Sequence, residues 1–255
     1  MKNWDLLKNP GFSGSDNMEY DLQLFHDFEH GSIPSTLRIY SWQPKCISYG
    51  YSQNIEQELE VVKARQLGWD IVKRPTGGGI VFHNEAEVTY SVVTALDDPK
   101  LPDGLIPSYK KLSEAVVWAL NSINVPASIR AQNLPAACLP ARQGKAGTEP
   151  RTQNPSLCFA VPAEYEIVVA GRKIVGAAQK RGRGSLLQQG SIFVRSMGQA
   201  ELDLLLDREQ AYNAVSVEEV LGKKIGFEQL SQALEKGFEQ VLAIELEPAT
   251  ERRGS

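Results

Sequence analysis

The chain has 255 residues, is 42% hydrophobic and 23% charged, and carries a formal net charge of −4. This composition is that of an ordinary globular protein. The slightly acidic balance excludes the broad basic field that is typical of nucleic-acid-binding domains. No run of roughly 18 apolar residues is present, so the sequence predicts neither a membrane span nor a membrane partner.

The three cysteines, Cys46, Cys138 and Cys158, are too few and too scattered to form a disulfide framework. The first stretch, MKNWDLLKNPGFSGSD, lacks the apolar core of a signal peptide. We therefore expect a protein of the reducing cytoplasm.

The first half of the chain contains helix and strand patterns in irregular order. Helices are predicted where apolar residues recur at helical spacing, over residues 15–31, 54–68 and 107–125. In the second of these segments, Asn54 followed by Gln57 resembles a capping box. Strands are predicted from short runs of β-branched and aromatic residues, over residues 36–42, 46–51, 69–74, 80–83 and 87–96.

The second half begins with a segment of unusual composition. Residues 131–156 contain four prolines, two glycines and no aromatic residue, and a loop of this length is usually functional or disordered. Three strands joined by glycine turns then form a predicted meander, over residues 165–169, 173–180 and 185–194. The remainder is predicted to be helical, over residues 201–206, 216–222 and 227–246. Because regular βαβ alternation is missing, the pattern favours an α+β fold with a mixed, largely antiparallel sheet flanked by helices.

Residues 72–83 read VKRPTGGGIVFH and place three consecutive glycines close to Arg74. The stretch does not match a phosphate-binding P-loop, which ends in Gly-Lys-Ser/Thr. Nor does it match the dinucleotide-binding GxGxxG motif, because a strand rather than a helix follows. Two interpretations stay open for Gly77, Gly78 and Gly79: bare backbone that lets a ligand approach closely, or a sharp corner in a sheet.

Cys158 and Lys173 are candidates for a nucleophile and its activating cation. Cys158 lies between a long loop and a strand, and such edges often carry reactive groups. Free cysteines are nevertheless among the most buried and inert residues. A nucleophilic thiol needs a nearby cation that lowers its pKa. Lys173 follows 15 residues later, near the start of the next strand, although a lysine after a turn is usually solvated.

The chain has three histidines, of which His26 and His30 are four residues apart on a predicted helix. This spacing can bind a metal ion, but no further ligand set completes a site, so we expect a solvated helix face and no metal. His83 ends the strand that follows the glycines and is a candidate for lining the same site. The basic turn KRGRG at residues 180–184 is either solvated or a contact for an acidic carrier protein.

Three stretches together resemble the lipoate–protein ligase and octanoyltransferase family, whose catalytic domain is similar to that of biotin–protein ligases. They are LRIYSWQPKCISYGYSQ, RPTGGGIVFHNEAEVTYSVV and YEIVVAGRKIVGAAQKRGRGSLLQQGSIFV. With the helix that contains residues 17–21, the resemblance covers about residues 15–195. It implies a catalytic domain of the class II synthetase and biotin-ligase type. We therefore expect a single catalytic domain over residues 1–255, with helices at residues 200–247 packed on its core.

Within this family, CFAVPAEYEIVVAGRKIVGAAQ is most similar to the cysteine-dependent octanoyltransferases of Gram-positive bacteria. The resemblance implies that Cys158 is the nucleophile and Lys173 its assisting lysine. An acyl pocket is expected, and the residues assigned to it are Arg74, Gly77, Gly78, Gly79, His83, Gly176 and Ala177. Gly79 stands where these transferases often carry arginine and many ligases carry glycine, so a ligase remains an alternative.

The resemblance implies octanoyl transfer in two steps, without a cofactor. Cys158 takes the octanoyl group from octanoyl acyl carrier protein as a thioester. It then passes the group to a lysine of a lipoyl domain, either in the glycine cleavage H protein or in a dehydrogenase E2 subunit. A related interpretation moves octanoyl groups between lipoyl-bearing proteins with the same cysteine.

Two alternatives to this transfer stay open. The first is an ATP- and Mg-dependent lipoate–protein ligase that forms lipoyl-AMP, in which Cys158 is a bystander. The second, from a different class, is a non-catalytic acyl- or carrier-binding protein on the same scaffold.

Overall fold

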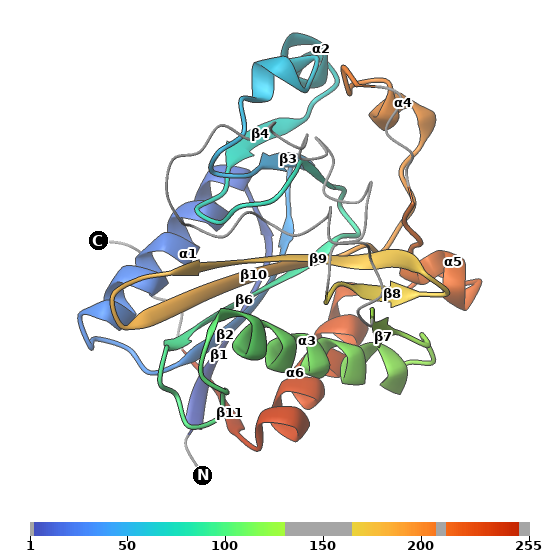
Figure 1. Ribbon diagram of the computed structural model, residues 1–255. Coiled ribbons are helices and arrows are strands. Elements are labelled where there is room, and N and C mark those ends of the chain that lie inside the picture. The colour runs from blue at the N-terminus through green and yellow to red at the C-terminus, as the bar shows by residue number, and fades with distance from the viewer. Residues whose placement is uncertain (1–2, 131–164, 208–212, 250–255) are drawn as a thin grey trace, which may run out of the picture.

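The computed structural model describes residues 3–130, 165–207 and 213–249, which form two sheets and the helices around them (Figure 1). The strands are β1 (Asn3–Phe12), β2 (Thr36–Trp42), β3 (Cys46–Tyr49), β4 (Asp70–Lys73), β5 (Val81–His83), β6 (Val88–Ala95), β7 (Ser128–Ile129), β8 (Ile167–Val169), β9 (Arg172–Arg181), β10 (Ser185–Ile192) and β11 (Glu245–Pro248). The helices are α1 (Gly14–Glu29), the short 3-10 helix η1 (Ile55–Gln57), α2 (Val61–Gln66), α3 (Leu105–Ser122), α4 (Gln199–Leu202), α5 (Val217–Leu221) and α6 (Phe227–Leu242).

The large sheet has eight strands in the order β11-β1-β2-β6-β10-β9-β8-β7. β1 pairs in parallel with β11 and with β2, and the other neighbouring strands pair antiparallel. The sheet is therefore mixed and largely antiparallel, and helices lie against it, which confirms the α+β fold predicted from the sequence. The meander of β8, β9 and β10 is likewise confirmed.

Helices cover both faces of the large sheet. α3 and α6 pack together on one face, while α1 lies on the other (Figure 1). α3 and α6 approach so closely that a Cβ at Gly237 would lie 2.3 Å from the Ala115 carbonyl oxygen, so only glycine fits there. The main apolar core lies between these two helices and the sheet, where the rings of Tyr90 and Phe238 are 5.6 Å apart.

The small sheet consists of β4, β3 and β5, in which β3 pairs in parallel with β4 and antiparallel with β5. It has an apolar cluster of its own, which includes Leu59, Trp69 and Phe82. The small sheet lies on the same side of the large sheet as α1 (Figure 1), and α1 contacts both β3 and β4.

The continuous helix predicted over residues 54–68 is wrong. The segment is divided into η1 and α2, and the Asn54 side chain makes no capping hydrogen bond. Between the two helices, Leu59 forms an isolated antiparallel bridge with Leu205, and the Glu60 N–H donates to the Leu204 carbonyl. These tertiary bonds hold the backbone extended where helix propensity alone predicted a further turn.

The helix predicted over residues 227–246 ends earlier, at Leu242, because Ala243 adopts a left-handed conformation with φ of 50°. The chain then forms β11, which pairs with β1 in a register that sets Asn3 opposite Glu245. β1 is absent from the sequence prediction because the Pro10-Gly11 pair within it is typical of a turn.

Two predictions concern residues that the structure does not describe. The proline-rich segment 131–156 and Cys158 lie outside the described residues. Within the described ranges, no helix is long and apolar enough to cross a membrane. The assignment of residues 1–255 to a single domain stays a prediction.

Candidate active site

A cleft opens where the small sheet meets strands β9 and β10 of the large sheet. Its empty space is about 360 Å³ with the open mouth included. Five of the residues assigned to the acyl pocket from the sequence line this cleft, namely Arg74, Gly77, His83, Gly176 and Ala177. The structure thus brings together the glycine stretch and the meander, which lie far apart in the sequence.

One wall of the cleft is the glycine loop, which follows β4 and is held by Arg74. The guanidinium Nη2 donates to the carbonyl oxygens of Gly77 and Gly79, at 3.2 and 2.7 Å, and Nη1 donates to the Ser48 hydroxyl at 2.6 Å. Gly78 has a φ of 96°, which is the left-handed region that favours glycine. Gly77 lines the cleft that the described residues form, whereas Gly78 and Gly79, which were also assigned to the acyl pocket from the sequence, do not.

The opposite wall consists of small residues on β9 and β10. Gly176, Ala177 and Ala178 lie on β9, and Gly190 of β10 is paired with Ala177. A Cβ at Gly190 would lie 2.3 Å from the Tyr90 ring, on the face of the sheet that packs against α3 and α6, so only glycine fits at this position. A wall of such small residues leaves room for an unbranched apolar chain.

Apolar and aromatic side chains complete the cleft, from Met18 of α1 and from Tyr40 and Trp42 of β2. The two walls are tied together by the Thr76 hydroxyl, which donates to Oε1 of Gln189 at 2.8 Å. The lining is therefore mainly apolar with a few fixed polar groups, which is the character of small-molecule sites.

His83 is buried in the wall of the cleft and stacks on the Trp42 ring, with centroids 4.0 Å apart. Its Nε2 lies 2.6 Å from the Ser48 hydroxyl and its Nδ1 lies 3.3 Å from the Ser191 hydroxyl. Burial and the charge of Arg74 hold the pKa of His83 well below its usual range. The imidazole is therefore neutral at pH 7.

Glu87 lies directly before β6 and is completely buried. The Ser191 hydroxyl oxygen lies 2.5 Å from its Oε1, within hydrogen-bond distance. Burial raises the pKa of Glu87 to about 8, because hydrogen bonds from Ser191 and from the Val194 N–H offset only part of the cost of desolvation. At neutral pH the carboxyl group is therefore mostly protonated.

Lys173 lies near the start of β9 and is 1% exposed. Its ammonium group forms an ion pair with the carboxylate of Glu166. Lys173 is three residues before Gly176 on the same strand, but it does not itself line the cleft that the described residues form. Because Cys158 lies outside the described residues, the pairing of Cys158 with Lys173 stays a prediction.

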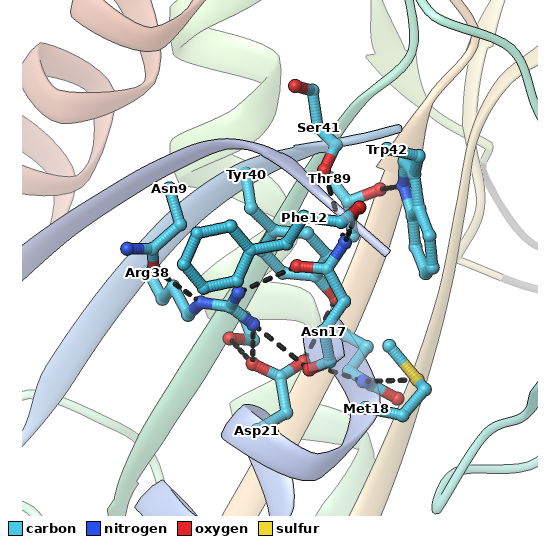
Figure 2. Close-up of polar contacts among 12 residues, drawn as sticks. Asn9, Phe12, Asn17, Met18, Asp21, Arg38, Tyr40, Ser41, Trp42 and Thr89 are labelled. Atoms are coloured by element: carbon cyan, nitrogen blue, oxygen red, sulfur yellow. Dashed lines mark hydrogen bonds and ion pairs between the residues drawn. The ribbon is translucent and has the colours of Figure 1, made fainter. Parts of the chain in front are cut away.

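A buried ion pair supports the floor of the cleft (Figure 2). Arg38 of β2 and Asp21 of α1 are both 0% exposed, with Nη1 and Oδ1 2.8 Å apart. Asp21 also accepts hydrogen bonds from the Tyr40 hydroxyl at 2.9 Å and from Nε2 of Gln189 at 2.7 Å. Two lining side chains are thus oriented by one carboxylate.

The remaining donors of Arg38 are fixed by α1 and β1. Its Nε donates to the Asn9 side chain at 2.7 Å, and its Nη2 donates to the Asn17 side chain at 2.7 Å. The guanidinium also stacks over the Tyr40 ring, 4.1 Å from the centroid. Figure 2 shows these side chains converging on the guanidinium. Such complete pairing is what makes a buried arginine tolerable.

No metal-binding group of three or more His, Cys, Asp or Glu side chains occurs within residues 3–130, 165–207 and 213–249. His26 and His30 contact each other instead, because Nδ1 of His30 lies 2.8 Å from the His26 carbonyl oxygen.

Several residues of the site were not predicted from the sequence, namely Thr76, Glu87, Glu166, Gln189 and Ser191. Gln189 and Ser191 occur in a strand, SLLQQGSI, in which every residue is buried. A strand buried on both faces is expected to be apolar throughout. The polar residues of this strand could therefore have been recognised as candidates for a functional site. Glu166 gave none, because its partner Lys173 is recognised only once β8 and β9 are paired.

The fold is similar to that of solved lipoate–protein ligases. The solved structure of lipoate-protein ligase A bound with ATP has a TM-score of 0.73 and 23% identity, covering 98% of this chain and 90% of that one. A bi-partite lipoate protein ligase of Thermoplasma acidophilum has a TM-score of 0.72 and 20% identity, covering 99% and 88%. At these identities the likeness concerns the fold.

The family model for the lipoyl protein ligase A/B catalytic domain matches residues 13–239. Octanoyltransferase LipM of Kyrpidia tusciae is 35% identical over 97% of this chain and 90% of its own length. Octanoyltransferase LipM of Bacillus subtilis is 31% identical, over 96% and 88%. The chain therefore belongs to the lipoyl protein ligase A/B catalytic domain family, as an acyltransferase of its octanoyltransferase group. These relatives favour octanoyl transfer over the ligase and over a non-catalytic protein.

The Asp21–Arg38 pair yields a stability prediction. Asp21→Asn leaves the Arg38 charge buried without its counter-ion, so the free energy of unfolding should fall by about 3–5 kcal/mol. Urea unfolding followed by circular dichroism measures this loss. Glu19→Gln, an exposed change on the same helix, serves as the matched control and should change stability little. Equal stability of the two variants would contradict the role given to the pair.

The raised pKa of Glu87 predicts a pH dependence of stability. Between pH 4.5 and about 8 the carboxyl group is protonated in the folded protein and ionised in the unfolded chain. Unfolding then releases a proton, so Glu87 makes stability fall with rising pH by about 1.4 kcal/mol per pH unit. Above about pH 8 its contribution is constant.

Glu87→Gln removes this dependence. We expect the variant to become more stable relative to the wild type as pH rises from 6.5 to 8, a window above the usual pKa of His83. Urea titrations at several pH values measure the difference in slope, and exposed Glu85→Gln is the control. Parallel curves for wild type and Glu87→Gln would show that the carboxyl titrates normally.

Proposed function

We propose that the chain takes an octanoyl group from octanoyl acyl carrier protein onto Cys158 and passes it to the lysine of a lipoyl domain. The observation that carries the proposal is the cleft itself, with apolar lining and walls of glycine and alanine from the glycine loop, β9 and β10. Such walls leave room for an unbranched acyl chain. The buried Lys173–Glu166 pair lies at the start of one wall strand.

The first step forms a thioester on the enzyme. The Cys158 thiolate attacks the carbonyl carbon of the donor thioester, and the bond to the carrier sulfur breaks, which releases the carrier thiol. A free thiol is only a few per cent ionised at pH 7. Lys173, a cation fixed by Glu166, would raise that fraction by lowering the thiol pKa.

The second step transfers the octanoyl group to the acceptor. The neutral ε-amine of the acceptor lysine attacks the Cys158 thioester, the carbon–sulfur bond breaks, and the amine proton is lost as the amide forms. An amide is more stable than a thioester, so the transfer needs no ATP, metal ion or other cofactor. ATP and Mg would be required only by the ligase alternative.

Both proposed partners are proteins. The donor is octanoyl acyl carrier protein, and the acceptor is a lipoyl domain of the glycine cleavage H protein or of a dehydrogenase E2 subunit. The solved bi-partite ligase of Thermoplasma acidophilum was studied together with its E2 lipoyl domain, which supports the same class of acceptor here. Neither nucleic acid nor a membrane takes part in the proposal, and we place the reaction in the cytoplasm.

Acylation of Cys158 is tested by mass spectrometry. Incubation with octanoyl carrier protein, without ATP, should add one octanoyl group that hydroxylamine removes. Cys158→Ala should abolish the adduct, whereas Cys138→Ala, a change of another cysteine in the same segment, should retain it. ATP-dependent modification of a lipoyl domain by Cys158→Ala, with no adduct on the wild type, would falsify the transferase in favour of the ligase. If neither the octanoyl adduct nor ATP-dependent modification of a lipoyl domain is observed, the protein is a non-catalytic binding protein.

The role of Lys173 is tested by alkylation of Cys158 with iodoacetamide. Lys173→Ala should slow alkylation severalfold near pH 7 and move the rate profile to higher pH, because the thiol loses its cation. Lys180→Ala, on the same strand, is the matched control. An unchanged profile for Lys173→Ala rules out the pKa-lowering role, and faster alkylation at all pH values would indicate local unfolding instead.

A further inference from the structure

A chain of five polar groups runs through the wall of the cleft. The Ser191 hydroxyl lies 2.5 Å from Glu87 Oε1 and 3.3 Å from His83 Nδ1. On the other side of the ring, His83 Nε2 lies 2.6 Å from the Ser48 hydroxyl, whose oxygen accepts from Arg74 Nη1 at 2.6 Å. We call Glu87, Ser191, His83, Ser48 and Arg74 the buried relay.

The two ends of the buried relay differ in what they can do. Arg74 can only donate, and so fixes the direction at its own end. An ionised Glu87 can only accept, so Ser191 donates to it and in turn accepts a proton carried on His83 Nδ1. His83 Nε2 then accepts a hydrogen bond from the Ser48 hydroxyl, and the Ser48 oxygen accepts one from Arg74 alone.

A neutral Glu87 favours the opposite direction. Its Oε2 has no hydrogen-bond partner among the described residues, so a proton there would be buried without an acceptor. On Oε1 the proton can be donated to Ser191. The Thr89 hydroxyl, 3.3 Å from Ser191, already accepts from Trp42 Nε1 and so can donate its own hydrogen to Ser191. Ser191 then donates to His83 Nδ1. The ring proton must now sit on Nε2, and Ser48 receives two donors, His83 and Arg74.

We propose that Glu87 is a positioning residue that sets the tautomer of His83 through Ser191, and thereby the strength with which Arg74 holds the glycine loop. With Glu87 ionised, Ser48 accepts from Arg74 alone and the hold is strongest. The inference rests on the proposed function, in which this loop lines the acyl pocket. No covalent bond other than those to hydrogen changes, and the proton that Glu87 releases goes to solvent.

Among the described residues around Glu87, no other charged group outside the buried relay is placed to set the direction of its hydrogen bonds. β6 and β10, which flank it, carry no charged side chain. The titratable group on β6 is Tyr90, whose hydroxyl accepts from Gln188. Beyond β10, Arg195 and Glu218 pair with each other, with Nε and Oε2 3.2 Å apart. On the small-sheet side, the groups are His83 and Arg74, which belong to the relay.

The tautomer is measured by nuclear magnetic resonance on protein labelled with ¹⁵N-histidine. Of the three histidines, the His83 signals are assigned by His83→Gln. In the wild type we expect Nε2 to carry the proton at pH 6.5, where Glu87 is neutral, and Nδ1 to carry it well above pH 8, where Glu87 is ionised. A single tautomer throughout would overturn the proposal.

Two variants and a control isolate Glu87. Glu87→Gln cannot ionise, so His83 should keep one and the same tautomer at every pH. Ser191→Ala cuts the relay, and should also abolish the pH-dependent exchange even if Glu87→Gln folds poorly. Glu85→Gln, exposed and two residues away, should behave as the wild type. A wild-type exchange in Ser191→Ala would contradict the inference.

A kinetic measurement connects the relay to the cleft. In the wild type the KM for an octanoyl thioester should fall severalfold as Glu87 ionises, whereas the KM of Glu87→Gln should not follow this titration. A wild-type KM that is the same below and above the titration would contradict the hold on the glycine loop. The magnetic resonance result does not depend on catalysis, so a failure of the relay is distinguishable from a failure of the proposed octanoyl transfer.

Discussion

The buried ion pair between Arg38 and Asp21 is the constraint on which the rest of the site depends. A guanidinium inside a protein is tolerated only when an opposite charge and hydrogen-bond acceptors surround it. Both side chains are 0% exposed, so the folded protein can bury this pair only if α1 packs against β2. The same carboxylate then orients Tyr40 and Gln189, which are parts of the cleft. The position of a helix and the shape of the floor are thus set together.

From that floor, polar contacts lead into both walls of the cleft. Gln189 accepts a hydrogen bond from Thr76, which directly precedes the glycines. Arg74 donates hydrogen bonds to two backbone carbonyls of the glycine loop. The opposite wall offers only small residues, Gly176, Ala177 and Ala178 of β9 and Gly190 of β10. Polar groups therefore give the cleft its rigidity, and missing side chains give it room. This division suits an acyl group, which offers an enzyme little to hydrogen-bond except its carbonyl.

Much of this could be predicted from the sequence, and the failures have physical causes. The meander was predictable because glycine turns separate its three short strand-like segments. Residues that gather in the cleft, such as His83 and Gly176, were found through a motif. Glu87, at one end of the buried relay, was not found from the sequence, because nothing in the neighbouring sequence distinguishes a buried glutamate from a solvated one. Helix 54–68 failed where Leu59 pairs with Leu205, a partner that no window of neighbouring sequence contains.

A crystal structure of the octanoylated enzyme, prepared from the octanoyl donor in the absence of any acceptor, tests the position of the acyl site most directly. We expect an eight-carbon chain lying between Gly77 and Gly176 of β9, with its carbonyl carbon bonded to the Cys158 sulfur and Lys173 close to that sulfur. A chain bound elsewhere on the protein, or a thioester remote from Lys173, would show that this cleft is not the acyl site.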